Sequence, residues 1–367
     1  MKLKAYRTYL AIALLVICCA TTALAQNIPN PPSLASLNIE VQKPGIDFNE
    51  EQPDDKGVNP SVSEKTKTLS KTYAVDGNDK LAINNQYGKV EINTWTKNEI
   101  KVDVEIKAFE SSDAKAEELL NAVSIHESKV SNLISFRTEI ERRNMNWSSR
   151  FRNGKEDRRG VQINYTIYMP INNPLDIVNK YGSTVLSDFT GPVNIDNSYG
   201  SFNAMKLSNA VNRVKVGYGS ADINGLYSGY LDIAYGSLDL QLGDKIDADI
   251  RYSSSKIDKL INGGTFDIKY TSGFKVSEVD KSVKKLTVNA SYSDVALGID
   301  NASNFDFDVT VNYAEFHYND DKVTITSKSP DDNERGFNPK KVYKGRFGNS
   351  ADATVSVKSN YGSVKFQ

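Results

Sequence analysis

The sequence predicts an all-β protein: a parallel β-solenoid of coils about 18–22 residues long, with a small N-terminal cap made of a sheet and one helix. Three features predict this class: a recurring tyrosine, apolar residues that alternate with polar ones, and turn residues beside each tyrosine. The tyrosines return every 17 to 22 residues, at Tyr181, Tyr199, Tyr218, Tyr235, Tyr252, Tyr270, Tyr292 and Tyr313. A period of this size, built from strand-like segments, is typical of a solenoid whose coils bury their apolar sides against one another.

Within each repeat, the apolar residues follow the period of two that is typical of a strand. Five positions after the tyrosine stand Leu186, Ala204, Ile223, Leu240 and Ile257. A second apolar run comes before the next tyrosine, as in Val214 with Val216 and Phe266 with Ile268. Since successive side chains of a strand point to opposite faces, each run has one face for a core. We therefore expect two or three short strands in each coil.

Stacked coils would place the tyrosines above one another, so we expect a ladder of packed aromatic rings. We favour a structural ladder, with rings facing inward or flush with a corner, over outward rings that form a track for sugars. Tyr235→Asp should therefore cost several kcal/mol, because it buries an unpaired charge against aromatic neighbours.

The residue after the tyrosine is glycine in the first four repeats of the array, which suits either a positive φ or a close backbone approach. These glycines are Gly182, Gly200, Gly219 and Gly236. Later repeats carry Ser253, Thr271, Ser293 and Ala314 there. A left-handed backbone at this position in every coil is therefore not expected. Two outlying copies of the phrase, Asn85–Asn93 and Asn360–Phe366, are predicted to be coils of the same ladder or its terminal rungs.

The chain begins with the pattern of a secretory signal peptide. A basic start leads into an apolar stretch and then into Ala23-Leu24-Ala25, a cleavage signal that predicts removal of residues 1–25. A lipoprotein signal ending at Cys18 or Cys19 is the alternative, but Ile17 fits its pattern poorly. Because both cysteines lie in this leader, the mature chain has no disulfide and no thiol ligand. We expect an exported protein of the periplasm, cell surface or outer membrane, with no transmembrane segment after cleavage.

The remaining chain divides into three predicted parts. Residues 26–68 are rich in proline and charged residues and are predicted to be a flexible linker. Residues 69–170 alternate like strands and include one short helix from Asp113 to Val123, with Ser112 or Asp113 as its N-cap; they form the predicted cap. Residues 171–367 hold the solenoid repeats, with a loop at 327–350.

Residues 142–159 are strongly basic and include Trp147 and Phe151. Our preferred interpretation is a solvated loop between two strands. The alternative is an arm that makes weak contact with anionic lipid or another polyanion.

The sequence offers no pattern for catalysis or cofactor binding, so we predict no catalytic, cofactor-binding or metal-binding residues. The two histidines, His126 and His317, lie far apart and in no ligand motif. Some β-helices are polysaccharide lyases or hydrolases with rows of charged residues on one face. A candidate acidic row is Asp222, Asp232, Asp239, Asp249 and Asp258, although alternation alone already demands polar residues on an outer face.

The phrase Asn-x-Tyr-Gly-x-Val-x-Ile at Asn85–Ile92, echoed at Asn179 and Asn197 behind a signal peptide, resembles the bacterial putative-adhesin family of β-strand-repeat proteins. The resemblance covers about residues 70–367. It implies a β-solenoid, export to the cell envelope and no catalytic residues.

These observations predict a non-enzymatic, adhesin-like or structural protein of the envelope that presents a rigid, repetitive β surface. The expected partner is an envelope polymer, a glycan or a surface protein. A formal charge of −1 gives no case for nucleic acid. The alternatives are a polysaccharide-active β-helix enzyme and an envelope sensing or tethering module that uses residues 142–159.

Overall fold

The structure, a computed structural model, describes residues 62–141, 148–152, 155–319, 321–331, 336–349 and 352–367, with the backbone alone at 148–152 and 155–158. The description below concerns the unit Asn59–Gln367. Its described residues form one helix and strands β1 to β25, which confirms the all-β class.

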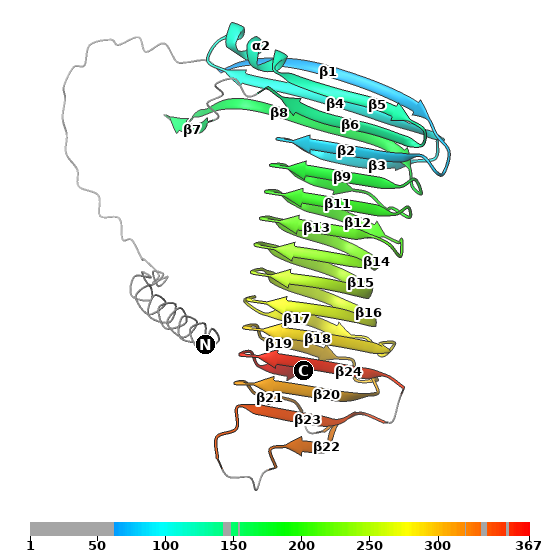
Figure 1. The fold of residues 1–367 in the computed structure, drawn as a ribbon, viewed down its shortest axis with the longest axis vertical. Coiled ribbons are helices and arrows are strands. Elements are labelled where there is room, and N and C mark those ends of the chain that lie inside the picture. The colour runs from blue at the N-terminus through cyan, green and yellow to red at the C-terminus, as the bar shows by residue number, and fades with distance from the viewer. Residues whose placement is uncertain (1–61, 142–147, 153–154, 320, 332–335, 350–351) are drawn as a thin grey trace, which may run out of the picture. The chain divides into compact units, whose positions relative to one another are not determined.

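Two stacks of parallel strands, here called ladder A and ladder B, make up most of this unit (Figure 1). In spatial order, ladder A consists of β2 (Lys80–Gln86), β9 (Leu175–Lys180), β11 (Val193–Ser198), β13 (Arg213–Gly217), the second halves of β14 (Ser220–Ala234), β15 (Ser237–Arg251) and β16 (Ser254–Lys269), β18 (Lys285–Ser291), β24 (Thr354–Asn360) and β20 (Phe305–Asn312).

Ladder B runs alongside in the same order. It consists of β3 (Val90–Trp95), β10 (Thr184–Leu186), β12 (Phe202–Leu207), the first halves of β14, β15 and β16, β17 (Phe274–Val279), β19 (Val295–Ile299), β25 (Val364–Phe366) and β21 (Phe316–His317). One strand of ladder A, a tyrosine corner and one strand of ladder B together make a rung, and the described residues form ten rungs.

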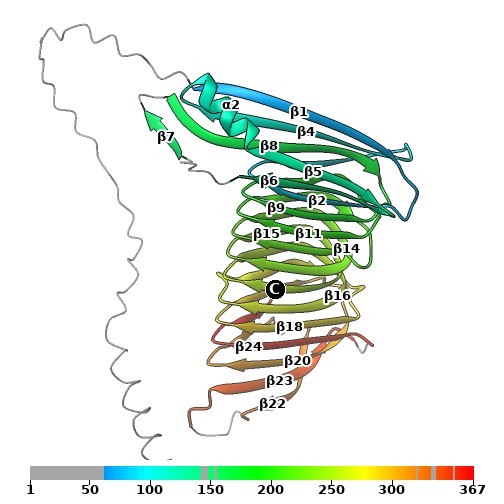
Figure 2. The same cartoon turned by 45° about the horizontal axis from the view of Figure 1, so that its top comes forward.

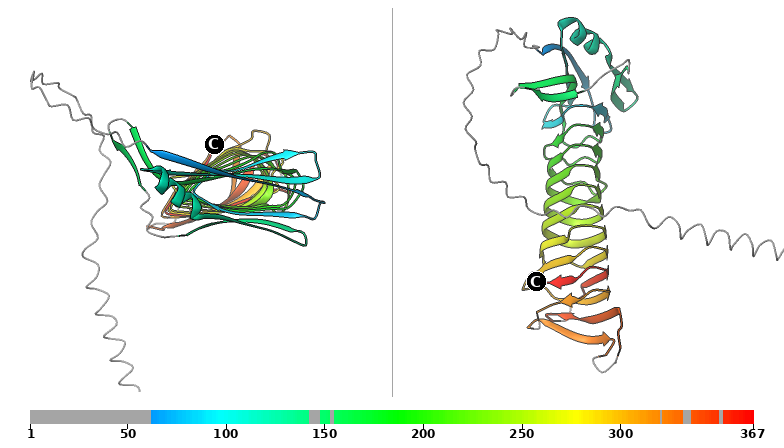
Figure 3. Two further views of the ribbon diagram at one scale, coloured as in Figure 1. Left: turned by 90° about the horizontal axis from the view of Figure 1, so that it is seen from above. Right: turned by 90° about the vertical axis from the view of Figure 1, so that its left-hand side faces the viewer.

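The core lies between the two ladders, which appear as two layers when viewed along the stack (Figure 3). Register carries over from rung to rung: Ile195 pairs with Ile177 on one side and with Val214 on the other. Equivalent apolar side chains therefore lie over one another, and those that the sequence placed inward are buried. Burial of each large aliphatic side chain contributes about 1.5–3 kcal/mol, so repetition of one pattern stabilises the whole stack.

The spatial order of the rungs differs from their order along the chain. Residues 354–366 lie between the rung of Tyr292 and the rung of Tyr313, because β24 pairs with β18 on one side and β20 on the other. The copy at Asn360–Phe366 is thus an internal rung of the ladder, whereas the copy at Asn85–Asn93 belongs to the first rung.

At the N-terminal end, each ladder gains one more parallel strand and then continues into antiparallel strands (Figure 2). Ladder A is extended by β6 (Leu133–Ile140) and β5 (Val123–Val130), and ladder B by β8 (Lys155–Pro170), β4 (Glu99–Glu110) and β1 (Ser63–Ala74). Strand β7 (Ser148–Arg152) pairs with the start of β8.

Helix α2 (Asp113–Asn121) packs on β1 and β4. Ser112 is its N-cap, and the Ser112 side chain accepts a hydrogen bond of 3.5 Å from the backbone N–H of Lys115. The short helix that the sequence predicted is therefore confirmed. Strand β1, in contrast, starts at Ser63, inside the range 26–68 that was predicted to be linker.

At the other end, β23 (Lys340–Phe347) pairs antiparallel with β20, and β22 (Val323–Ser329) pairs with β23. The predicted loop at 327–350 was therefore wrong for residues 327–329, which end β22, and for residues 340–347. Strands at the end of a stack bury little surface, so their apolar alternation is weak and the pattern gave no sign of them. In the described part of the chain, no helix is both long and apolar enough to cross a membrane.

Candidate functional site

A continuous stack of ten tyrosine rings runs along the corner where the two ladders meet. Neighbouring ring centroids lie 4.8–5.1 Å apart, and neighbouring ring planes are 1–15° from parallel. In spatial order the rings are Tyr87, Tyr181, Tyr199, Tyr218, Tyr235, Tyr252, Tyr270, Tyr292, Tyr361 and Tyr313. The aromatic ladder that the sequence predicted is confirmed.

The stack lies at the surface. Nine of the rings, all but Tyr87, are 49–55% exposed. Because each ring face inside the stack is covered by the next ring, only the ring edges and the hydroxyl groups reach solvent. Sugars therefore cannot stack on ring faces along the array, as an outward track would require.

The tyrosine and the glycine after it both make the sharp corner possible, the tyrosine through its backbone conformation and the glycine through its lack of a side chain. All ten tyrosines have a positive φ, between 50° and 64°. The glycines that follow do not; they allow close approach instead, since a Cβ on Gly236 would lie 1.8 Å from the carbonyl oxygen of Gly219. The left-handed residue is therefore the tyrosine, and of the two explanations considered for the glycine, close backbone approach is confirmed.

Buried asparagines support the first corners from inside. The side chain of Asn197 donates to the carbonyl oxygens of Gly200, at 2.9 Å, and Ser201, at 3.4 Å. Asn179 donates in the same way to Ser183, at 3.1 Å, and Ser359 donates to Gly362, at 2.6 Å. The Asn-x-Tyr-Gly-Ser phrase therefore has a local cause: the amide satisfies carbonyl groups that the sharp corner turns inward.

A row of serines follows the tyrosines two positions later. These side chains are partly or fully exposed and come from successive rungs: Ser183, Ser201, Ser220, Ser237 and Ser254. We call these serines and the ten tyrosines the tyrosine–serine edge. It presents hydroxyl groups, which both donate and accept hydrogen bonds, at the rung spacing.

The predicted acidic row is divided between the two outer faces. Asp222 pairs in register with Asp239 on ladder B, whereas Asp232 pairs with Asp249 on ladder A. Asp232 lies 2.5 Å from the guanidinium group of Arg251. Asp258, on ladder B, lies 2.7 Å from the ammonium group of Lys256.

Asp249 accepts a hydrogen bond from the Tyr230 hydroxyl. This bond, together with partial burial, raises the pKa of Tyr230 to about 12. Asp232, Asp249 and Asp258 are therefore held by different partners, and the row is divided between two faces rather than gathered at one reaction centre.

The histidines are not brought together either. His126 lies on β5, where its Nε2 is 2.9 Å from a carboxylate oxygen of Glu139. His317 lies on β21, in register with Lys365. Near His126, a shallow hollow of about 470 Å³ is lined by Arg137 and Asp176, among others. Asp176 is in an ion pair with Lys80.

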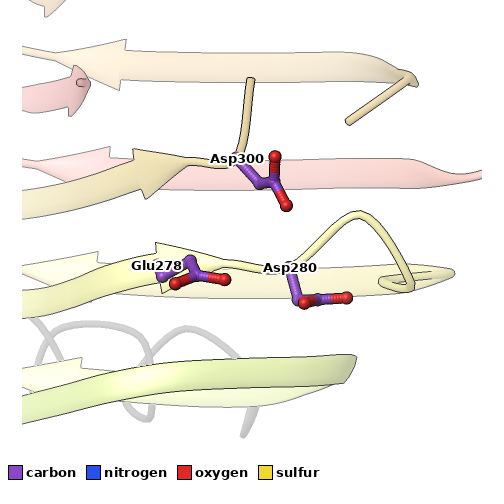
Figure 4. A group of neighbouring side chains, drawn as sticks. All are labelled: Glu278, Asp280 and Asp300. Carbon is purple, nitrogen blue, oxygen red and sulfur yellow. The ribbon is translucent and has the colours of Figure 1, made fainter. Parts of the chain in front are cut away.

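Three carboxylates that the sequence did not single out lie close together (Figure 4): Glu278 near the end of β17, Asp280 just after β17 and Asp300 just after β19. Their nearest oxygens are within 4.8 Å of one another. The ammonium group of Lys259 is 2.5 Å from Glu278 and 2.7 Å from Asp280. The hydrogen bond from Lys259 holds the pKa of Asp280 down at about 2. Because a lysine already supplies the positive charge, we assign no metal ion to this cluster.

The side chains of the basic segment 142–159 lie outside the described residues up to position 158. Its contact with anionic surfaces therefore stays a prediction. The backbone of Ser148–Arg152 and Lys155–Arg159 forms an antiparallel pair. The signal peptide and its cleavage after Ala25 also lie outside the described residues.

Comparison with known proteins gives a likeness to solved structures at low similarity. No protein-family model matches the chain, and no curated protein matches it. A "putative adhesin" from Parabacteroides distasonis ATCC 8503 is 8% identical, with 82% of this chain and 97% of that chain covered and a TM-score of 0.38. A "putative cell adhesion protein" from Clostridium sporogenes ATCC 15579 is 11% identical, with 82% and 99% covered and a TM-score of 0.20.

A "putative adhesin" from Bacteroides fragilis NCTC 9343 is 11% identical, with 82% and 97% covered and a TM-score of 0.25. These descriptions agree with the family resemblance drawn from the sequence. With such low TM-scores and identities, the likeness carries no argument about what this chain binds.

Proposed function

We propose that this chain is an exported, non-enzymatic binding protein of the cell envelope, built on a parallel β-solenoid. In this proposal, cleavage after Ala25 removes the leader. The region from Gln26 to the start of β1 at Ser63 tethers the folded unit, the antiparallel strands and α2 close its first rung, and the ten rungs form the binding body. Closing the ends matters, because open sheet edges invite association with other strands.

The observation that carries the proposal is the tyrosine–serine edge. Nine half-exposed phenol groups at spacings of 4.8–5.1 Å form one uninterrupted row. A ligand that makes full use of such a row must itself be long and repetitive and must offer hydrogen-bonding groups at regular intervals. A linear glycan of the envelope, or of a neighbouring cell, has this chemistry.

Affinity would come from many weak contacts. Each hydroxyl-to-hydroxyl hydrogen bond contributes about 0.5–1.5 kcal/mol. Once the first sugars are bound, the next ones meet neighbouring hydroxyls at high effective concentration, so the contacts add up without a dominant site. A preformed stack also limits the ordering cost of binding, since its side chains are already fixed by their neighbours.

The arrangement of charges supports binding rather than catalysis. Glycosidic hydrolysis generally uses two carboxyl groups that flank one bond at a defined separation. Among the described residues, Asp232 and Asp258 lie on different outer faces, and each is in an ion pair with a basic side chain.

The test is binding of residues 26–367 to an array of glycans, envelope polymers and host matrix proteins, with product release scored on the same array. Binding to a linear glycan without product release supports the proposal. Release of shortened glycan would replace it with the polysaccharide-active enzyme.

A matched pair of variants locates the binding surface. Tyr218→Phe with Tyr235→Phe removes two hydroxyls from the edge but keeps the ring stack, so glycan affinity should fall about tenfold at unchanged stability. Tyr168→Phe with Tyr227→Phe removes two hydroxyls elsewhere and should leave affinity unchanged. Equal effects of the two pairs would move the ligand away from the edge.

A further inference from the structure

The ninth rung is supplied by a segment that lies out of order in the chain. Strand β24 pairs over seven residues with β18 and over seven residues with β20, all in parallel. Strand β25 pairs with β19 and β21 in the same way. The ring of Tyr361 lies 4.8 Å from Tyr292 and 4.9 Å from Tyr313.

The chain connection between the two neighbouring rungs leaves a gap of one rung for this segment. Residues 208–212, 280–284 and 300–304 each join ladder B to ladder A through five residues. The first two connections lead from one rung to the next. Residues 300–304 instead lead to the second rung along, because β20 is separated from β18 by β24. The slot for a ninth rung is therefore set by residues 285–317, independently of the segment that fills it.

The slot is apolar and specific for its occupant. Val357 and Val364 are fully buried in it, and Phe366 is 4% exposed. The ring of Phe366 packs edge to face against aromatic residues of the tenth rung, with centroids 4.9–6.2 Å apart: Phe305, Phe307 and Phe316. A Cβ on Gly362 would lie 2.0 Å from the carbonyl oxygen of Ser293, so the occupant must carry glycine there. An empty slot would expose these rings and two strand edges.

The covalent link to the occupant is short. Residues 348–353 connect β23 to β24. Six residues can span about 20 Å when extended. The link crosses only β20, a step of two strand spacings or about 10 Å.

We propose that the slot is an exchange site between copies of this chain: residues 354–366 of a second copy fill it with the same pairings that the chain's own segment makes. Identical contacts form in either case, as in domain swapping, so the choice depends on concentration. A segment on a short tether acts at an effective concentration in the millimolar range. The chain's own segment should therefore fill the slot in dilute solution, and exchange should appear where copies are crowded. Reciprocal exchange would link copies side by side and multiply their tyrosine–serine edges.

Cysteine pairing tests this directly, because the chain from Gln26 onward has no cysteine. Ala296 lies opposite Lys365 across β19 and β25, and neither is buried. Adjacent strands are about 4.8 Å apart, within the range that a disulfide spans. One copy carries Ala296→Cys and the other Lys365→Cys, each with its own tag. The two are mixed at rising concentration in mild urea, returned to buffer and oxidised.

Exchange predicts a disulfide-linked heterodimer at least about tenfold above a control pair in which Glu91→Cys replaces Lys365→Cys, and its yield should rise with concentration. A chain with both Ala296→Cys and Lys365→Cys should close internally, which confirms the geometry. If this chain closes internally while the mixed pair gives no more heterodimer than the control at any concentration, the proposal is overturned.

A second measurement does not depend on the cysteine variants. A labelled peptide of residues 352–367 should be taken up by the intact protein in mild urea and retained after the urea is removed. The same peptide with Val357→Asp should not, since its charge would enter the core. Equal uptake of the two peptides, or uptake of neither, would contradict exchange.

Discussion

The tyrosine of each corner has a left-handed backbone, a conformation that costs a non-glycine residue about 1–2 kcal/mol. Two interactions offset this cost. Each inner ring stacks on two neighbours, as Tyr235 does on Tyr218 and Tyr252, and aromatic pairs contribute about 0.5–1.5 kcal/mol each. In several rungs a buried amide or hydroxyl also binds the corner, as Asn197 does. Strain at one residue is thus tolerated because it places a ring in the stack.

The first prediction concerns the ring of Tyr235, which is 49% exposed. The large cost expected for a charge at a buried position does not apply here. Tyr235→Asn, which tolerates the left-handed backbone, should lower the free energy of unfolding by about 1–3 kcal/mol through the loss of two stacking contacts. Tyr235→Val should cost more, because a branched side chain disfavours positive φ. Urea unfolding followed by far-UV circular dichroism measures both. A smaller loss for valine than for asparagine would contradict this account.

The second prediction separates close approach from flexibility at the neighbouring glycine. Gly236→Ala should destabilise the protein by about 3 kcal/mol or more, because its Cβ would meet backbone atoms that cannot move freely. Gly217→Ala is the matched control: it lies in the neighbouring rung with nothing within 4 Å of its Cβ, so its stability should be close to that of the parent. The thermal unfolding midpoints of the two variants measure this difference, and equal midpoints would contradict the close-approach explanation.

The third prediction concerns acid. The hydrogen bond from Lys259 lowers the pKa of Asp280 from 3.8 to about 2, so the folded state favours its charged form. A depressed folded-state pKa gives stability that is present above pH 3.8 and is lost as pH falls toward 2. In the Asp280→Asn variant, the midpoint of urea unfolding should therefore fall less between pH 4 and pH 2 than it does in the parent protein. Asp239→Asn, at an exposed position on ladder B, should leave that fall unchanged.

Among the elements, β1 shows how an end of the sheet is kept from associating. In the described part of the chain its only strand partner is β4, so its other edge has free backbone groups. Lysines at positions 65, 67 and 71 discourage pairing with another strand along this edge.

The fourth prediction follows from this edge. Lys67→Val with Lys71→Val should cause self-association that sedimentation velocity detects. Lys215→Val with Lys256→Val changes two lysines on strands that already have neighbours on both sides, and should leave the protein in its original state. Equal association of the two variants would mean that apolar surface, rather than the free edge, is responsible.

Elements with a buried face were predictable, and those at the ends were not. The alternation at residues 80–84, 100–106 and 161–169 indicated β2, β4 and β8, because one face of each strand is buried in the core. Strands β1 and β23 lie at or near the ends of the stack and bury few side chains, so their sequences resemble a linker and a loop. The alternation of apolar and polar residues arises where one face of a strand is buried, so an edge strand with little buried surface shows little of it.

For the whole folded unit, the period revealed the rungs but not their order. Ten tyrosine phrases predict ten equivalent positions, and the ring stack follows from that equivalence. Equivalence is also why Tyr361 could not be placed between Tyr292 and Tyr313: interchangeable rungs make similar contacts in any order. The left-handed tyrosine was missed for a different reason, since the adjacent glycine is the residue normally expected to carry a positive φ.

The fifth prediction tests whether the rungs are equivalent units. Deletion of Gly236–Tyr252, which is 17 residues, joins Tyr235 to Ser253 and removes one complete rung. In a repeat architecture, stability is roughly a sum of units and their interfaces, so the remaining nine rungs should still fold with one cooperative transition. Small-angle scattering should show the stack shortened by about 4.8 Å.

Deletion of Gly236–Lys245, only ten residues, is the control, since it leaves Tyr252 seven residues after Tyr235, too few to form both strands of a rung. The longer deletion should therefore fold and the shorter one should not. This order is the reverse of what deletion size alone would give. If both chains unfold, the rungs are not interchangeable and the stack depends on individual contacts between particular neighbours.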